Sequence, residues 1–556
     1  MKHRFTFLFV IFFIVLAQSY DAKAQQGFEK FLQNSQISGN FELDGMYYNK
    51  DSLIGAPDVP QKVLMNAFVN INYVYGPFSA GLRFENYLYA LQGYDSRYKG
   101  IGIPYRYVSF EKDKFTITVG NSYDQFGSGM IFRAWQDFSL GYDNSLDGLN
   151  IKVKPWKGIT LKGIWGYQRF YFTHSPGIVR GADAELAINE MFTKLNDKNL
   201  RVTIGGSFVS KYQDASDPVY NLPKNVGSYA GRANIVYKNF SISGEYVHKI
   251  NDPSAFNNRI YKPGNATLMQ VTYAKKGMGF YLAAIRTDNM SFKTDRDASG
   301  NDLNINYLPS MAKQTTYSLA AMYPYATQPN GEFGFQAQTV FSFKKKSVLG
   351  GKYGTAFSLT YSQYNAIEKH QLDDITPLDS TGTLGYKSDF FKIGKQVNYQ
   401  NFNLEFSKKV NKRFKMIFSY FYIMYNAKVI EGHSIPNIHS HVGIADLTFN
   451  LNDRHALRTE LQYLYTKQGE GSWMYALLEY TLAPKWFFSV SDQYNYDNPI
   501  VEKRIHYYGI AAAYAIGSTR ISLNYGRQRA GIFCVGGVCR YVPAANGLSL
   551  TLTSSF

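Results

Sequence analysis

The chain is poor in cysteine and, beyond its start, lacks long apolar runs. Its 556 residues contain two cysteines, which excludes a framework of several disulfides. After residue 24, no uninterrupted apolar stretch approaches the roughly 20 residues that a membrane-spanning helix needs. The nine histidines are scattered, without a compelling spacing to serine or carboxylate residues. We therefore expect neither an enzyme nor a bound cofactor.

The first 24 residues have the pattern of a secretory signal peptide. A basic start at Lys2 and Arg4 precedes an apolar run, and Ala22-Lys23-Ala24 provides an A-x-A cleavage site. We predict a signal peptide over residues 1–24, followed by a short periplasmic segment over 25–36. An exported chain without a helical anchor is either soluble outside the inner membrane or a β-barrel in the outer membrane.

The residues that are abundant favour the barrel. Aromatic residues make up 17% of the chain, with 46 Tyr and 41 Phe, as expected for girdles of rings at the two membrane interfaces. The formal net charge is +17, and loss of three cationic residues and one anionic residue with the predicted signal peptide leaves +15. Such a charge attracts nucleic acid, acidic lipid headgroups or anionic solutes. The placement of the charge discriminates among these partners, and much of it lies in short turns; we predict no nucleic-acid partner.

The last residues of the chain alternate between apolar and polar. Serine and threonine occupy one row of a two-residue period, and the other row holds Leu548, Leu550, Leu552 and Phe556. One alternative is the edge strand of a soluble sheet. However, a terminal strand that ends on an aromatic residue resembles the closing strand by which outer-membrane barrels are recognised during assembly. The resemblance implies that these four residues are an assembly signal for the barrel-assembly machinery.

The same alternation recurs along the whole chain. From Lys62 to Tyr75 one row is apolar and the other is rich in asparagine. Two further segments carry charges in their polar rows, namely Arg83 and Glu85 in one and Arg458 and Glu460 in the other. Charges in the inner row predict a solvated interior, so these four residues are candidates for the lumen.

Short and long connections alternate between these segments, as in barrels with short periplasmic turns and longer outer loops. Counting the segments gives about 24 strands, within the ~8 to 26 that are usual for bacterial barrels. We predict an all-β fold over 37–556, a large transmembrane antiparallel β-barrel with an even number of strands. Both termini are then periplasmic, in the outer membrane of a Gram-negative bacterium. The most notable predicted outer loops are 126–144, 287–331 and 366–396.

Residues 287–331 are predicted to form one long outer excursion. Parity requires an even number of crossings between Arg286 and Ala366, yet three segments qualify as strands. Pro324 and Pro329 disfavour the first of the three, because proline cannot complete a ladder of hydrogen bonds. We expect the excursion to fold over or into the lumen. The three segments are 316–325, 332–343 and 355–364.

Residues 121–144 form the densest unusual segment. Gly127 and Gly129 allow positive φ or a close backbone approach, and charged side chains alternate with aromatic ones. One interpretation is an inward-folded loop that narrows a pore. The other is a twisted strand end with ordinary loop charges. The first interpretation gives four candidate constriction residues, namely Asp124, Arg133, Asp137 and Asp143.

Several stretches resemble an uncharacterised family of Bacteroidota outer-membrane β-barrel proteins. They are Tyr123–Met130, Gly141–Leu149, Gly166–Arg169, and the ending Cys539–Pro543 with Phe556. The resemblance extends over the whole mature chain. It implies a porin-like barrel without a plug domain, and it implies no activity.

Two cysteines enclose the sequence Val-Gly-Gly-Val ahead of the last strand. In an exported protein, Cys534 and Cys539 at this spacing predict a small loop-closing disulfide. Metal binding is the alternative, and no two further ligands lie in that loop. Three histidines around an outer loop could bind a transition metal, but loop histidines are more often solvated, so we predict no metal site. They are His433, His439 and His441.

Two functions remain. A TonB-dependent receptor would suit the strand number, since barrels near ~22 strands are usually plugged, but residues 25–36 are too short for a plug domain. The first remaining function is a porin-like channel for small polar or anionic solutes, narrowed by its loops because an empty barrel this wide would leak. The second is a non-conducting barrel that acts as an accessory or scaffold in an outer-membrane assembly, secretion or surface-attachment complex. Outer-membrane lipid is a partner in both, and other outer-membrane proteins are partners in the second.

Overall fold

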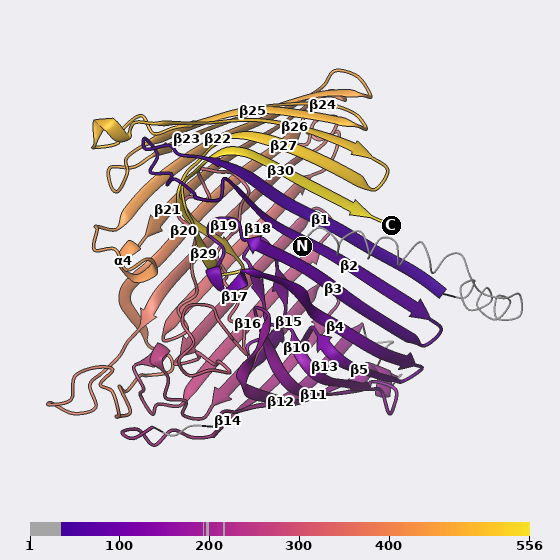
Figure 1. Ribbon diagram of the computed structural model, residues 1–556, viewed down its shortest axis with the longest axis vertical. Coiled ribbons are helices and arrows are strands. Elements are labelled where there is room, and N and C mark those ends of the chain that lie inside the picture. Colours follow the sequence, from indigo (N-terminus) through magenta and orange to yellow (C-terminus); the bar gives the residue numbers. More distant parts are fainter. Residues whose placement is uncertain (1–34, 193, 196–198, 215–216) are drawn as a thin grey trace, which may run out of the picture.

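The protein forms one closed β-barrel, described here from a computed structural model (Figure 1). The structure describes residues 35–192, 194–195, 199–214 and 217–556. Twenty-four strands form a single antiparallel sheet, which the pairing of the first strand with the last one closes. The predicted all-β fold, antiparallel pairing and even strand number of about 24 are confirmed. The predicted signal peptide and most of 25–36 lie outside the described residues.

The barrel strands follow the chain around the barrel, so that each pairs with its sequence neighbour. They are, in order, β1 (Ser35–Asn49), β2 (Val63–Tyr75), β3 (Phe78–Tyr89), β4 (Gly100–Lys112), β5 (Phe115–Ser122), β10 (Leu146–Val153), β11 (Ile159–Phe170), β12 (Thr173–Ala187), β13 (Leu200–Tyr212), β14 (Asn225–Tyr237), β15 (Phe240–Lys249), β16 (Gly264–Lys275), β17 (Met278–Asp288), β18 (Glu332–Phe343), β19 (Thr355–Ile367), β20 (Ile393–Lys409), β21 (Phe414–Tyr425), β22 (Ile438–Asn450), β23 (His455–Tyr465), β24 (Trp473–Leu482), β25 (Trp486–Tyr494), β26 (His506–Ile516), β27 (Thr519–Gln528) and β30 (Ala545–Ser555).

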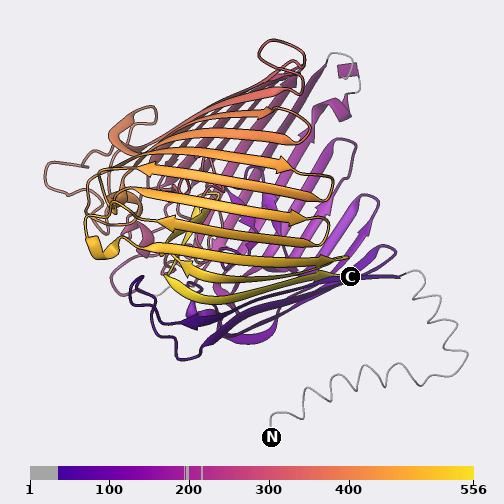
Figure 2. The ribbon, with the colours of Figure 1, turned by 90° about the horizontal axis from the view of Figure 1, so that it is seen from above.

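The connections differ between the two ends of the barrel. Figure 2 shows short turns and the C-terminus gathered at one end, at the right, and most of the long connections at the other end, at the left. The exception at the long-connection end is the tight turn between β11 and β12. Two one-turn helices, α3 (Ile188–Met191) and α4 (Ala427–Ile430), lie in connections. No described helix has the length and the apolar character needed to cross a membrane.

The closing strand β30 lies between β27 and β1. Leu548 and Leu550 point outward and are 46% and 37% exposed. Thr551, in the opposite row, donates a hydrogen bond to Asp44 Oδ1 on the inner side of β1 over 2.7 Å. The period-two pattern therefore separates an apolar exterior from a polar interior in this strand.

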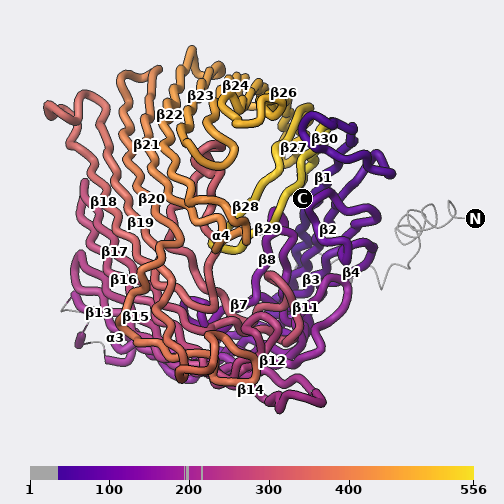
Figure 3. The backbone as a smooth tube through the Cα atoms, turned by 90° about the vertical axis from the view of Figure 1, so that its left-hand side faces the viewer, coloured from indigo at the N-terminus to yellow at the C-terminus, as the bar shows by residue number. Residues whose placement is uncertain are grey.

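Three long connections turn inward rather than outward (Figure 3). They are residues 123–145 with the small hairpins β6 (Asp124–Phe126)–β7 (Phe132–Ala134) and β8 (Gln136–Asp137)–β9 (Tyr142–Asp143), residues 289–331, and residues 529–544 with the hairpin β28 (Gly531–Val535)–β29 (Val538–Val542). Together we call them the luminal plug. The excursion predicted over 287–331 thus folds into the lumen, and 316–325 is no barrel strand. β17 and β18, the strands before and after this excursion in the sequence, pair directly with each other.

The plug occupies the long-connection half of the barrel. Its apolar side chains, Phe126, Met130, Phe292 and Ile305 among them, are fully buried with small residues of the inner wall such as Val247. In the short-turn half, polar residues of the inner row remain exposed. This half is therefore open to water. Its exposed inner residues include Asn234, Lys415, Arg520 and Asn524.

Candidate functional site

A buried ion-pair network attaches residues 123–145 to the wall. Arg83 Nε and Arg169 Nη2 each donate to the Glu85 carboxylate over 2.6 Å. Asp143 Oδ2, from the plug, accepts from the guanidinium of Arg83 and, over 2.7 Å, from Nη1 of Arg169. The Tyr123 hydroxyl donates to the same oxygen over 2.9 Å. Two cations and two anions balance, which is the condition for keeping such a cluster buried.

The network also keeps the Asp143 carboxylate of the plug ionised. Burial alone would raise the pKa of Asp143, but Arg169 and Arg83 outweigh it and hold this pKa below the usual carboxyl range. Asp143 therefore stays ionised at neutral and mildly acidic pH. Arg83 and Glu85 are 2% and 0% exposed. The predicted solvated interior is wrong at these two residues, because the plug covers them.

The other charged residues of this segment have local partners. Asp124 pairs with Lys162 of β11 over 2.6 Å. The Arg133 guanidinium lies 4.3 Å from the ring centre of Tyr307. Asp137 accepts from the amide of Leu140 over 3.1 Å. The four predicted constriction residues thus have separate contacts: Asp124 and Asp143 bind wall residues, whereas Arg133 and Asp137 contact other parts of the plug.

Buried lysines of the wall hold the backbone of residues 289–331. Lys211 Nζ donates to the carbonyl of Lys293 over 2.8 Å, and Lys249 Nζ donates to the carbonyl of Ser291. Both lysines are 0% exposed, and Asp252 pairs with Lys211 over 2.8 Å. A buried charge is tolerated only when it is paired or well bonded. Sequence reasoning missed both residues, since a lysine in an inner row also suits an open lumen.

The far tip of the same segment reaches the opposite wall. The amide of Leu319 donates to Gln462 Oε1 over 2.9 Å, and Ser318 Oγ donates to Gln493 Oε1 over 3.1 Å. Arg458 lies in the inner row of this wall among three carboxylates, and the predicted solvated interior is wrong at its neighbour Glu460, which is 5% exposed. The partners of Arg458 are Asp446 at 3.0 Å, Glu479 at 2.5 Å, and Glu460. Tyr317 of the plug donates to Asp446 Oδ2 over 3.3 Å, so the Arg458 and Arg83 clusters contact different parts of the plug.

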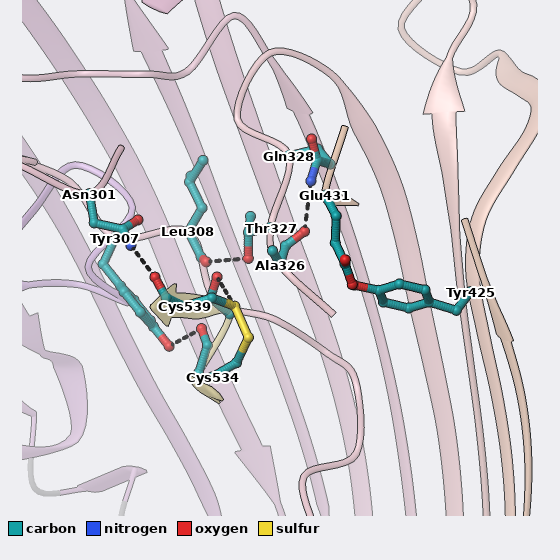
Figure 4. The surroundings of a disulfide bond; sticks show 12 residues. Asn301, Tyr307, Leu308, Ala326, Thr327, Gln328, Tyr425, Glu431, Cys534 and Cys539 are labelled. Carbon is teal, nitrogen blue, oxygen red and sulfur yellow. Dashed lines mark hydrogen bonds between the residues drawn. A yellow bond between two sulfur atoms is a disulfide. The ribbon is translucent and has the colours of Figure 1, made fainter. Parts of the chain in front are cut away.

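The third inward connection is tied to the second one. Cys534 and Cys539 form the predicted disulfide across β28 and β29. Figure 4 shows this hairpin facing Asn301 and Tyr307, whose side chains donate to the carbonyls of Cys539 and Gly536, each over 2.7 Å. Gly536 has φ +59°, and a Cβ there would meet the Tyr307 hydroxyl. The glycine pair therefore serves a close approach that the sequence alone did not reveal.

One cavity of about 560 Å³ remains between the plug and the wall formed by β1, β24–β27 and β30. Ser318, Arg529 and Arg540 of the plug line this cavity. Five tyrosines line it, namely Tyr48, Tyr94, Tyr475, Tyr507 and Tyr508. Amides and hydroxyls complete the lining, including Gln92, Ser491, Gln493, Asn524, Ser549 and Thr551. Because Asn524 is exposed, the cavity continues into the open half of the lumen.

The histidines near the outer loop have aromatic partners. His439 Nδ1 and His441 Nδ1 lie 2.9 Å and 2.7 Å from the hydroxyls of Tyr422 and Tyr420. His433 lies 3.0 Å from Glu431. Within the described ranges, no group of three or more His, Cys, Asp or Glu residues is arranged to hold a metal ion.

Comparisons with known proteins give a family and distant similarities to solved structures. The model of a family of unknown function (DUF6029) matches residues 1–556. No curated protein matches the chain. Among solved structures, a mutant ferric enterobactin receptor (PfeA) of Pseudomonas aeruginosa is similar, with 8% identity, a TM-score of 0.43, and coverage of 94% of this chain and 80% of the receptor. The P pilus usher (PapC) translocation pore has 9% identity, a TM-score of 0.44, and coverage of 94% and 99%. Scores this low carry no functional information about this chain.

Proposed function

The chain belongs to a family of unknown function (DUF6029), and we propose that it is a porin-like channel of the outer membrane for small polar or anionic solutes. Both termini then lie in the periplasm, at the short-turn end. The solute path runs through the polar cavity beside the plug and into the open half of the lumen. The plug limits the size of what passes.

The observation that carries this proposal is the contrast between the two halves of the lumen. The plug closes most of the long-connection half with buried apolar and ionic contacts. The remaining cavity of about 560 Å³ is lined with hydroxyls, amides and tyrosines rather than with closely packed aliphatic side chains. A wide barrel encloses an aqueous channel unless something fills it. Here the filling is incomplete beside β1, β24–β27 and β30, and a second, smaller cavity of about 350 Å³ lies between Gly127 and Ser128 of the plug and the wall of β12–β16.

The alternative is a non-conducting barrel that serves as an accessory or scaffold subunit. It is favoured by the number of direct bonds that hold the plug, from the buried lysines on one wall to Gln462 on the other. In that case the cavity is closed to ion flow at its outer end, and the partners are other outer-membrane proteins.

A planar lipid bilayer separates the two functions. We expect the purified wild-type protein to show stepwise conductance, with a reversal potential that favours anions under a salt gradient, because the chain without its predicted signal peptide carries a formal net charge of +15. A protein that inserts, as judged by its heat-modifiable mobility on gels, and yet remains electrically silent would contradict the channel. Stoichiometric co-purification with other outer-membrane subunits would then support the scaffold.

A further inference from the structure

The cavity beside the plug has a cation at its outer end that lacks a full set of partners. Arg540 belongs to β29, in the hairpin closed by the disulfide. Its Nε donates to the carbonyl of Ser139 over 2.8 Å, and its guanidinium lies 4.4 Å from the ring centre of Tyr94. Its Nη1 is buried and has no hydrogen-bond partner among the described residues. A buried donor of this kind is costly unless something pairs with it.

Other groups around the same cavity show a similar lack. Gln493 Nε2 is a buried donor without a partner in the described part of the chain, although Gln493 Oε1 accepts from Ser318. Gln92 Oε1 is a buried acceptor that likewise has no hydrogen-bond partner among the described residues. Two further arginines line the cavity: Arg527 pairs with Asp51 over 2.7 Å, whereas Arg529 lies 5.7 Å from the ring centre of Trp473. The lining therefore presents two unsatisfied donors, on Arg540 and Gln493, and two arginines of the plug, Arg529 and Arg540.

The anions in this lining do not satisfy those arginines. Asp44 lines the cavity, but its Oδ1 accepts from Thr551 of the neighbouring strand over 2.7 Å. Arg540 is fixed in orientation by Ser139 on one side and by the ring of Tyr94 on the other. A planar guanidinium that is fixed in this way suits a carboxylate or a phosphate, whose oxygens accept from two N–H groups at once.

We propose that this cavity is a binding site for an oxyanion, the carboxylate or phosphate of a small hydroxylated solute, with Arg540 as its main contact and Arg529 as a second cation. The tyrosines and amides of the lining then receive the uncharged body of the solute, in keeping with pockets that combine aromatic surfaces with a few polar groups. The inference rests on the proposed function only for the role of the site as a step in transport. Binding itself does not require conduction.

The site is tested by calorimetry on the whole chain in detergent, with three probes of similar size. D-Glucuronate and glucose 6-phosphate carry an oxyanion, and D-glucose is the neutral control. We expect both anions to bind at least about tenfold more tightly than glucose, since a charge-assisted pair adds more than a neutral hydrogen bond. The tighter of the two anions identifies the oxyanion as carboxylate or phosphate. Equal binding of all three probes would overturn the proposal.

Variants assign the binding to Arg540. Arg540→Gln retains hydrogen-bond donors but removes the charge, and we expect it to lose most of the preference for the two anions. Arg520→Gln is the matched control, because Arg520 faces the open half of the lumen away from the plug and should leave the preference intact. Arg540→Lys keeps the charge without the planar fork, so it should retain part of the preference. Unchanged binding in a folded Arg540→Gln protein would exclude the assignment.

The two proposals can fail separately. Anion binding in detergent together with an electrically silent bilayer supports the site and rejects the channel. Conductance without any preference for glucuronate or glucose 6-phosphate over glucose supports the channel and rejects the site.

Discussion

Replacing residues 290–329 with a short Gly-Ser turn should raise the single-channel conductance of the barrel roughly threefold or more. These residues form the largest part of the plug and reach from the wall at Lys211 to the wall at Gln462. Barrels of 16 strands or more leave an aqueous channel when nothing fills them, and this one has 24 strands. The measurement is a comparison of conductance steps between wild type and variant in planar bilayers.

The design leaves the barrel wall intact. Thr287 and Glu332 are direct partners in the β17–β18 register, so a short turn closes the gap without shifting either strand. The matched control is a similar shortening of the 344–354 connection, which lies at the opposite end and includes the fully exposed Val348. That control should conduct like wild type. Equal conductance of wild type and the 290–329 variant would show that the segment does not obstruct the path.

Removing the Asp143 carboxylate should release residues 123–145 from the wall. Asp143→Ala leaves two buried arginines, Arg83 and Arg169, with Glu85 as their remaining carboxylate. Breaking a buried ion pair from one side costs about 3–5 kcal/mol, because a charge remains without a partner. We expect trypsin to cleave after Arg133 in the variant far faster than in wild type, as measured by mass spectrometry of the fragments.

Two further variants separate the charge effect from a general loss of packing. Asp143→Ala combined with Arg83→Met leaves one arginine with Glu85, so part of the protection against trypsin should return. Asp137→Ala alters a carboxylate of the same segment that accepts from the amide of Leu140, and it should leave cleavage near the wild-type rate. If Asp143→Ala were as resistant as wild type, the network would not be what holds the segment.

The pH dependence of this attachment follows from the sign of the shift. The pKa of Asp143 is lowered in the folded protein, so the stabilisation is present above the ordinary carboxyl pKa and is lost as the pH falls through the lower, folded value. Docking of residues 123–145 should therefore be constant across neutral and mildly acidic pH. The ion pair does not serve as a switch near neutrality.

The barrel itself could be predicted from the sequence because its pattern is local. The strands alternate between residues that face hydrocarbon and residues that face water, and the row of Leu548, Leu550 and Leu552 shows this period in β30. Pro324 and Pro329 distinguished the inward excursion from the barrel strands that precede and follow it in the sequence. Strand pairing then follows chain order, since a barrel of hairpins leaves each strand next to its sequence neighbour.

The interior could be predicted only in outline. An inner row that faces water and an inner row that faces a plug both contain polar residues, and Lys211 and Lys249 fit either case. Their partners, the carbonyls of Lys293 and Ser291, lie far along the chain and carry no side-chain signature. Apolar residues in the inner rows, such as the fully buried Val247, are the sequence signal that these rows contact the plug rather than water near the long connections. The disulfide could be predicted from spacing, whereas its contact with Tyr307 could not.

Cysteine substitutions at two adjacent positions of β27 test whether the solute path runs through the cavity beside the plug. Asn524 lines the cavity and is exposed in the lumen, whereas the adjacent Leu523 points outward and is 45% exposed on the outer surface. Each is replaced by cysteine, and a charged methanethiosulfonate reagent is added during a bilayer recording. Conductance of Asn524→Cys should fall in a discrete step, while that of Leu523→Cys should not change. Conductance that is indifferent to the reagent at Asn524→Cys, with the modification confirmed by mass, would contradict a path through this cavity.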